Sequence, residues 1–154
     1  MNNRPLLLIV YHSQSGNTDR LSAAVEEGAR KVLDVRVERK KAAQVTAADI
    51  EQCRMLVVCS PEYFGYMAGA VKDLFDRTYE AVRQRIRGKP YALVICAGND
   101  GTGALNSIER ILKGCGVRRV QEPLISRGPV SEEILRKCRE LGETLAAGIE
   151  LGIY

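Results

Sequence analysis

Short apolar runs alternate with longer amphipathic segments along the whole chain. Apolar runs at 5–11, 55–59 and 91–96 predict strands, and the run at 55–59 is apolar at every position, as in the centre of a sheet. Segment 32–38 predicts an edge strand, because its valines alternate with charged residues. A weaker strand is predicted between 117 and 125. The pattern therefore predicts five strands.

Amphipathic segments separate these strands. Apolar residues at helical spacing predict helices over about 17–31 and 68–82, a helix that follows the glycine-rich stretch 98–103 and ends at Lys113, a last helix from Ser131 and a short helical turn at 47–52. Helices that alternate with strands in this way are typical of an α/β protein with a parallel sheet. The chain has 154 residues and shows no repeat or linker-like stretch, so we expect a single domain over 1–154.

Composition excludes several classes of protein. The apolar runs are shorter than the roughly 18 residues of a membrane span, and residues 1–10 lack the pattern of a signal peptide, so we expect a cytoplasmic protein. The five cysteines are widely spaced, which favours neither a disulfide framework nor a zinc site. The net charge is +4, but few aromatic residues lie near the basic groups. We therefore expect no nucleic-acid partner.

A polar turn follows the first predicted strand and leads into a helix, and it consists of Ser13, Gln14, Ser15, Gly16, Asn17 and Thr18. Backbone N–H groups at such a turn point at one spot, where the start of the helix favours an anion. The side chains add neutral donors, so the turn predicts a phosphate cradle without a charged residue. The glycine spacings of P-loops and dinucleotide folds are absent from the sequence. An ordinary polar turn with a helix cap is the alternative.

Two further loops follow predicted strands. The first is rich in aromatic residues and consists of Pro61, Glu62, Tyr63, Phe64, Gly65 and Tyr66. The second is rich in glycine and contains Gly98, Asn99, Asp100, Gly101 and Gly103. Parallel strands end at one edge of a sheet, so we expect the three loops to lie close together there. Together they predict a site for a mononucleotide with a planar ring. Alternatively, the aromatic loop folds back on the domain or forms a dimer contact.

These motifs resemble the flavodoxin-like family. Residues 13–18 are similar to that family's FMN-phosphate fingerprint, Ser or Thr, any residue, Ser or Thr, Gly, Asn, Thr. The stretch Ser60-Pro61-x-Tyr63-Phe64-Gly65, followed by Ala70-x-Lys72-x-x-x-Asp76-Arg77, is similar to the second flavin loop and next helix of NAD(P)H-dependent FMN and quinone reductases. The resemblance covers nearly the whole chain. It implies a three-layer α/β/α sandwich with five parallel strands in the order 2-1-3-4-5.

The resemblance also implies a cofactor and its place. FMN would bind with its phosphate on residues 13–18 and its ring between residues 61–66 and 98–103. NAD(P)H would be the electron donor, and a quinone or similar small molecule the acceptor. Carboxylates of Glu62 and Asp100 near the ring would lower its reduction potential. No side chain is identified from the sequence as a catalytic acid or base.

Three functions stay open after the sequence has been read. The first choice is an FMN-dependent NAD(P)H oxidoreductase. The second is a one-electron carrier of the flavodoxin type, which would work with a redox partner protein. The net charge of this chain, +4, argues against a carrier, because the resemblance implies that such carriers are strongly acidic. The third is a non-catalytic interaction domain that uses the aromatic loop for protein contacts. The sequence leaves a homo-oligomer open.

Overall fold

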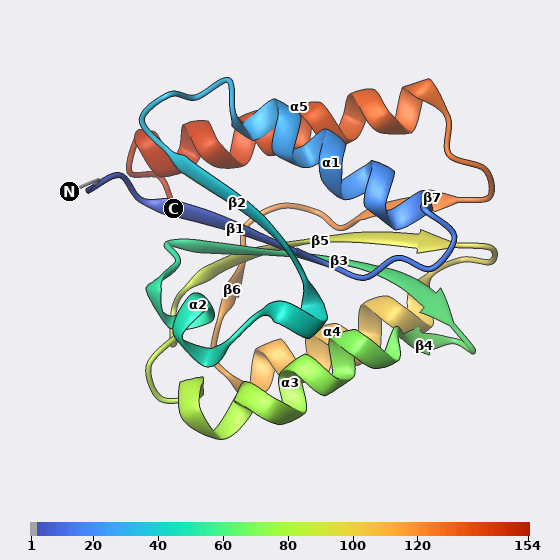
Figure 1. Cartoon of the computed structure of the whole chain (residues 1–154), viewed down its shortest axis with the longest axis horizontal. Helices are drawn as coiled ribbons and strands as arrows, with labels where there is room; N and C mark the ends of the chain where they lie inside the picture. Colours follow the sequence, from blue (N-terminus) through green and yellow to red (C-terminus); the bar gives the residue numbers. More distant parts are fainter. Residues whose placement is uncertain (1–2) are drawn as a thin grey trace.

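The computed structural model describes residues 3–154 and consists of one sheet with helices on both faces (Figure 1). In chain order the elements are β1 (Leu6–Tyr11), α1 (Asn17–Ala29), β2 (Arg36–Lys41), a 3-10 turn η1 (Ala42–Gln44), α2 (Ala47–Gln52), β3 (Met55–Tyr63), β4 (Tyr66–Met67), α3 (Gly69–Val82), β5 (Pro90–Ala97), α4 (Thr102–Gly114), β6 (Arg118–Arg119), β7 (Leu124–Arg127) and α5 (Glu132–Glu150). Within the described residues, no helix is both long and apolar enough to cross a membrane.

Parallel pairing organises the sheet. Strands β1, β3 and β5 lie side by side at its centre, and β2 pairs with β1 at one edge. At the other edge β6 and β7 both pair in parallel with β5, so together they fill the position of the fifth strand. This arrangement confirms the predicted α/β sandwich and the order 2-1-3-4-5. The two-residue β4 is an addition that pairs antiparallel with β3.

The core lies on both faces of the sheet. Helices α1 and α5 cover one face, where Leu7 and Ile9 of β1 are buried, and α3 and α4 cover the other, where Leu8 is buried (Figure 1). Helices α1 and α5 touch at their backbones, because a Cβ on Gly28 would lie 1.8 Å from the Arg139 carbonyl oxygen. This contact ties the first helix to the last.

Two strands differ from the prediction. The second strand begins at Arg36, which pairs with Leu6, and not at residue 32. Residues 30–35 form turns that lead from α1 to the edge of the sheet, and Val35 is buried there without belonging to a strand. The last predicted strand is divided, and residues 120–123 separate β6 from β7. Pro123 contributes to the division, because it has no N–H to donate to a strand ladder.

The predicted aromatic loop, residues 61–66, is largely a hairpin. Strand β3 continues to Tyr63, and the chain turns at Phe64 and Gly65 into β4. Both turn residues have positive φ, 54° for Phe64 and 67° for Gly65, as in a type I′ turn. This conformation costs a residue with a side chain about 1–2 kcal/mol. The side chain of Phe64 is fully exposed, at 108% relative area, so its packing does not offset that cost.

We expect Phe64→Asn to raise the free energy of unfolding by about 1 kcal/mol, because asparagine tolerates the left-handed region better than phenylalanine. Urea unfolding followed by circular dichroism measures the change. Phe64→Ala is the matched control, since it removes the exposed ring but keeps a Cβ at positive φ. An equal gain in both variants would contradict the explanation.

Candidate functional site

A cleft of ≈ 580 Å³ lies at the carboxyl ends of the parallel strands. Its volume falls within the range of sites that bind small molecules and cofactors. The cleft is formed by the segments that follow β1, β5 and β7 and by the end of β3, and it is lined by Ser13, Gln14, Ser15, Asn17, Thr18, Arg20, Pro61, Glu62, Tyr63, Cys96, Ala97, Gly98, Gly128, Pro129 and Val130. The structure thus brings all three predicted loops to one edge of the sheet.

The polar turn after β1 presents the start of α1 to this cleft. Gly16 is the N-cap of α1, with φ 97°, and it has no side chain that could satisfy the first N–H groups of the helix. The Ser13 hydroxyl accepts a hydrogen bond from the Gly16 N–H at 3.0 Å and so holds the turn together. The N–H groups at the start of α1 therefore remain available for an anion in the cleft.

Tyr63 joins the hairpin to this turn. Its hydroxyl accepts a hydrogen bond from the Gln14 backbone N–H. Burial raises the pKa of Tyr63, and the hydrogen bond from Gln14 opposes that rise in part. The His12 ring meets the Tyr63 ring edge to face, with 6.1 Å between the centroids. Of the three predicted aromatic residues, Tyr63 alone lines the cleft, whereas Phe64, Gly65 and Tyr66 lie at the tip of the hairpin.

The hairpin rests on the first turns of α4. The Glu62 carboxylate accepts a hydrogen bond from the Ala104 N–H at 3.0 Å, and the Met67 N–H donates to the Ser107 hydroxyl at 3.1 Å. A Cβ on Gly103 would lie 1.9 Å from the Gly65 carbonyl oxygen, so only glycine allows this approach. The start of α4 interacts favourably with the charge of Glu62. Glu62 and Gly103 thus hold the wall of the cleft in position.

The glycine-rich loop after β5 has a mixed role. Gly98 lines the cleft, whereas Asn99, Asp100, Gly101 and Gly103 do not. The Asp100 carboxylate accepts hydrogen bonds from the Thr102 N–H at 2.9 Å and from the Thr102 hydroxyl at 2.8 Å. The backbone hydrogen bond from Thr102 is the main cause of a lowered pKa of Asp100. Asp100 therefore stabilises the start of α4, next to the cleft.

Sequence reasoning missed six residues that line the cleft: Arg20, Cys96, Ala97, Gly128, Pro129 and Val130. The Gly128-Pro129 pair is a turn signal directly after the fifth strand, and it could have been recognised as a fourth loop at the same edge. Cys96 is the last position of a predicted strand, and only the structure shows that this residue lines the cleft. Burial raises the pKa of Cys96, although a hydrogen bond from Thr18 opposes this.

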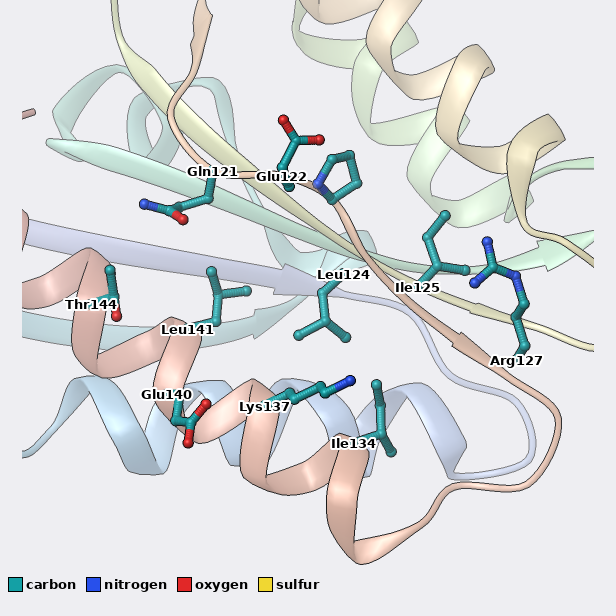
Figure 2. Close-up of a pocket in the computed structure, with 11 residues that line it drawn as sticks. Gln121, Glu122, Leu124, Ile125, Arg127, Ile134, Lys137, Glu140, Leu141 and Thr144 are labelled. Atoms are coloured by element: carbon teal, nitrogen blue, oxygen red, sulfur yellow. The ribbon is translucent and has the colours of Figure 1, made fainter.

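A second hollow of ≈ 500 Å³ lies along the outer edge of the sheet. Figure 2 shows Ile134, Lys137 and Leu141 of α5 facing Leu124 of β7 across it. Charges of both signs line this hollow, which shares no residue with the cleft. Because ligands of open parallel sheets bind at the carboxyl ends of the strands, we assign the ligand site to the cleft and not to this hollow.

The fold and the cleft define an α/β protein with a candidate ligand site at the carboxyl edge of a parallel sheet, and comparisons with known proteins show its family. A sequence model of the family described as NADPH-dependent FMN reductase matches residues 30–128, more than half of the chain. A flavodoxin from Aquifex aeolicus (strain VF5) is 28% identical over 161 residues, which covers 94% of this chain and 87% of that protein. The chain thus belongs to the NADPH-dependent FMN reductase family, and the resemblance seen in the sequence is confirmed.

Solved structures show how widely this fold is shared. A flavodoxin from the domain Archaea superposes with a TM-score of 0.81 at 21% identity, over 94% of this chain and 99% of that chain. A flavodoxin, WrbA-like protein from Agrobacterium tumefaciens superposes with a TM-score of 0.76 at 17% identity, over 93% of this chain and 96% of that chain. At this level of identity, the two structures confirm the flavodoxin-like fold.

We expect Gly103→Ala to lower the free energy of unfolding by about 2 kcal/mol, because the added methyl group would overlap the Gly65 carbonyl oxygen. Urea unfolding measures the loss. Gly69→Ala at the start of α3 is the matched control, since a Cβ there meets nothing within 4 Å. If the two variants are equally stable, the hairpin is not held against α4 as the structure indicates.

The pKa of Asp100 leads to a prediction about pH. A carboxylate whose pKa is lower in the folded state contributes stability above its ordinary value of 3.8, and this contribution is lost as pH falls through the folded pKa. We therefore expect Asp100→Ala to lower the thermal midpoint at pH 7, with a difference from the unmodified protein that shrinks toward pH 3. Asp34→Ala, which removes an exposed carboxylate from a turn, is the control. A difference that is constant with pH would contradict the role of the charge.

Proposed function

We propose that the protein binds FMN in the cleft and acts as an NAD(P)H-dependent oxidoreductase that reduces quinones or similar acceptors. The observation that carries the proposal is the start of α1, where N–H groups without a side-chain cap face a cleft of ≈ 580 Å³. A phosphate fits this end, because the N–H groups and the helix dipole both favour an anion. Membership of the NADPH-dependent FMN reductase family supports the choice of cofactor and of donor.

Under this proposal, the site residues predicted from the sequence have different roles. Ser13, Gln14, Ser15, Gly16, Asn17 and Thr18 would hold the phosphate. Pro61, Tyr63 and Gly98 would flank the planar ring. Gly65, Gly103 and Asp100 would support these walls from outside, whereas Phe64, Tyr66, Asn99 and Gly101 do not line the cleft. These residues would hold FMN, which would supply the chemistry for electron transfer from the nicotinamide donor to the acceptor.

Two titratable side chains of the cleft, those of Tyr63 and Cys96, would stay neutral. Burial raises the pKa of the Tyr63 hydroxyl and of the Cys96 thiol, so both are protonated at neutral pH. The Glu62 carboxylate is held by the Ala104 N–H and stabilised by the start of α4. Glu62 therefore exerts a weaker field on a ring in the cleft than an unpaired carboxylate would. The protein would thus bind and orient the cofactor without a side chain that acts as acid or base.

A one-electron carrier is the second candidate, because a flavodoxin from Aquifex aeolicus is similar over 94% of this chain. This candidate would exchange electrons with a partner protein and would not oxidise NAD(P)H. The net charge of the chain, +4, would favour an acidic partner protein. Either function is compatible with the cytoplasm, where the five free cysteines would stay reduced.

Titration of the flavin-free protein with FMN tests the proposal, with riboflavin as the ligand without phosphate. We expect strong quenching of FMN fluorescence and weak quenching of riboflavin fluorescence. We also expect NADPH oxidation by the FMN-loaded protein in the presence of a benzoquinone. Ser15→Glu should weaken FMN binding by at least about tenfold, because it brings a negative charge to the phosphate, whereas the neutral Ser15→Gln should not.

Each outcome separates the candidates. If neither flavin binds, the cofactor proposal is wrong and an interaction domain remains. If FMN binds but NADPH and NADH are not oxidised with any acceptor, the reductase proposal is wrong. Two well-separated one-electron stages on stepwise reduction would then support the carrier.

A further inference from the structure

Arg20 is the one cationic side chain among the described residues that line the cleft. It lies in the first turn of α1, and its N–H donates to the Gly16 carbonyl at 3.1 Å, an i to i−4 bond at the start of the helix. Side chains of a helix lean toward its N-terminus and cover the preceding turn. We therefore expect the Arg20 side chain, which lines the cleft, to lean over residues 16 and 17 of the polar turn.

The charge of Arg20 is not compensated by its neighbours. The adjacent Asp19 is held by Arg39, with 2.6 Å between the carboxylate and the guanidinium. Glu62, the one carboxylate that lines the cleft, accepts its hydrogen bond from the Ala104 N–H. Within residues 3–154 the side chain of Arg20 makes no hydrogen bond or ion pair, and it is exposed. An unpaired cation therefore stands beside the N–H groups at the start of α1.

We infer that Arg20 determines the specificity of the cleft for a phosphorylated flavin, because its guanidinium binds the phosphate of FMN. This inference rests on the proposed function, since it assigns a role within the same site. The planar guanidinium matches two phosphate oxygens at once, and such charge-assisted hydrogen bonds are stronger than neutral ones. The sequence predicted a cradle of neutral donors, and Arg20 adds a charge to that cradle. Binding then depends on salt, because ions screen an exposed pair.

Binding measurements on Arg20→Gln test the inference. Loss of a hydrogen bond to a charged group predicts FMN binding that is weaker by about 10- to 100-fold, with riboflavin binding unchanged. A change from about 50 to 500 mM salt should weaken FMN binding to the unmodified protein more than to Arg20→Gln, because the Debye length falls over this range. Arg20→Lys should give an intermediate affinity, since it keeps the charge but loses the planar fork.

Arg110→Gln is the matched control, because Arg110 is an exposed arginine of α4 that does not line the cleft. It should bind FMN as the unmodified protein does. Riboflavin binding and the thermal midpoint of each variant show whether the cleft is intact.

The outcomes distinguish the inference from the proposed function. If the unmodified protein binds FMN and Arg20→Gln binds it equally well, the inference is wrong and the proposed function stands. If Arg20→Gln loses FMN and riboflavin to the same extent, Arg20 supports the shape of the cleft, and its phosphate role is wrong. If the unmodified protein binds no FMN, both are wrong.

Discussion

The parallel pairing of β1, β3 and β5 is the constraint on which the rest of the structure depends. Parallel strands need a crossover between them, and in this chain the crossovers contain the helices that cover both faces of the sheet. The same parallel pairing makes β1, β3, β5 and β7 end at one edge of the sheet. Residues near positions 13, 61, 98 and 128, which are far apart in the sequence, therefore line one cleft. The direction of the parallel strands therefore sets the position of the cleft, and individual side-chain contacts only shape its walls.

At that edge of the sheet, helix α4 holds the walls of the cleft in position. Its first turns hold the hairpin through Glu62 and Gly103, and Asp100 stabilises its start. The hairpin in turn reaches the start of α1 through the hydrogen bond between Tyr63 and Gln14. Two helix N-termini thus contribute to one site in different ways. That of α4 binds carboxylates of the chain itself, whereas that of α1 lacks a side-chain cap and faces the cleft.

The candidate site was partly predictable. The polar turn at 13–18 stood out because its residues are adjacent in the sequence, and Ser13, Gln14, Ser15, Asn17 and Thr18 all line the cleft. The aromatic loop was predicted with less success. The sequence does not show that Phe64 and Tyr66 lie at the tip of a hairpin, because that depends on the antiparallel pairing of β3 with β4. Arg20 was missed because its place in the cleft depends on which side of α1 packs on the sheet.

The sequence by itself determined the strand and helix order, the buried central strands and the polar turn. These features depend on the periodic burial of neighbouring residues and on local turn chemistry, which a short window of sequence contains. The tertiary structure alone decided where β2 begins to pair, how the fifth strand divides, and which charged side chains face the cleft. Those features depend on register and on contacts between distant segments, such as Gly65 with Gly103, which no local pattern encodes.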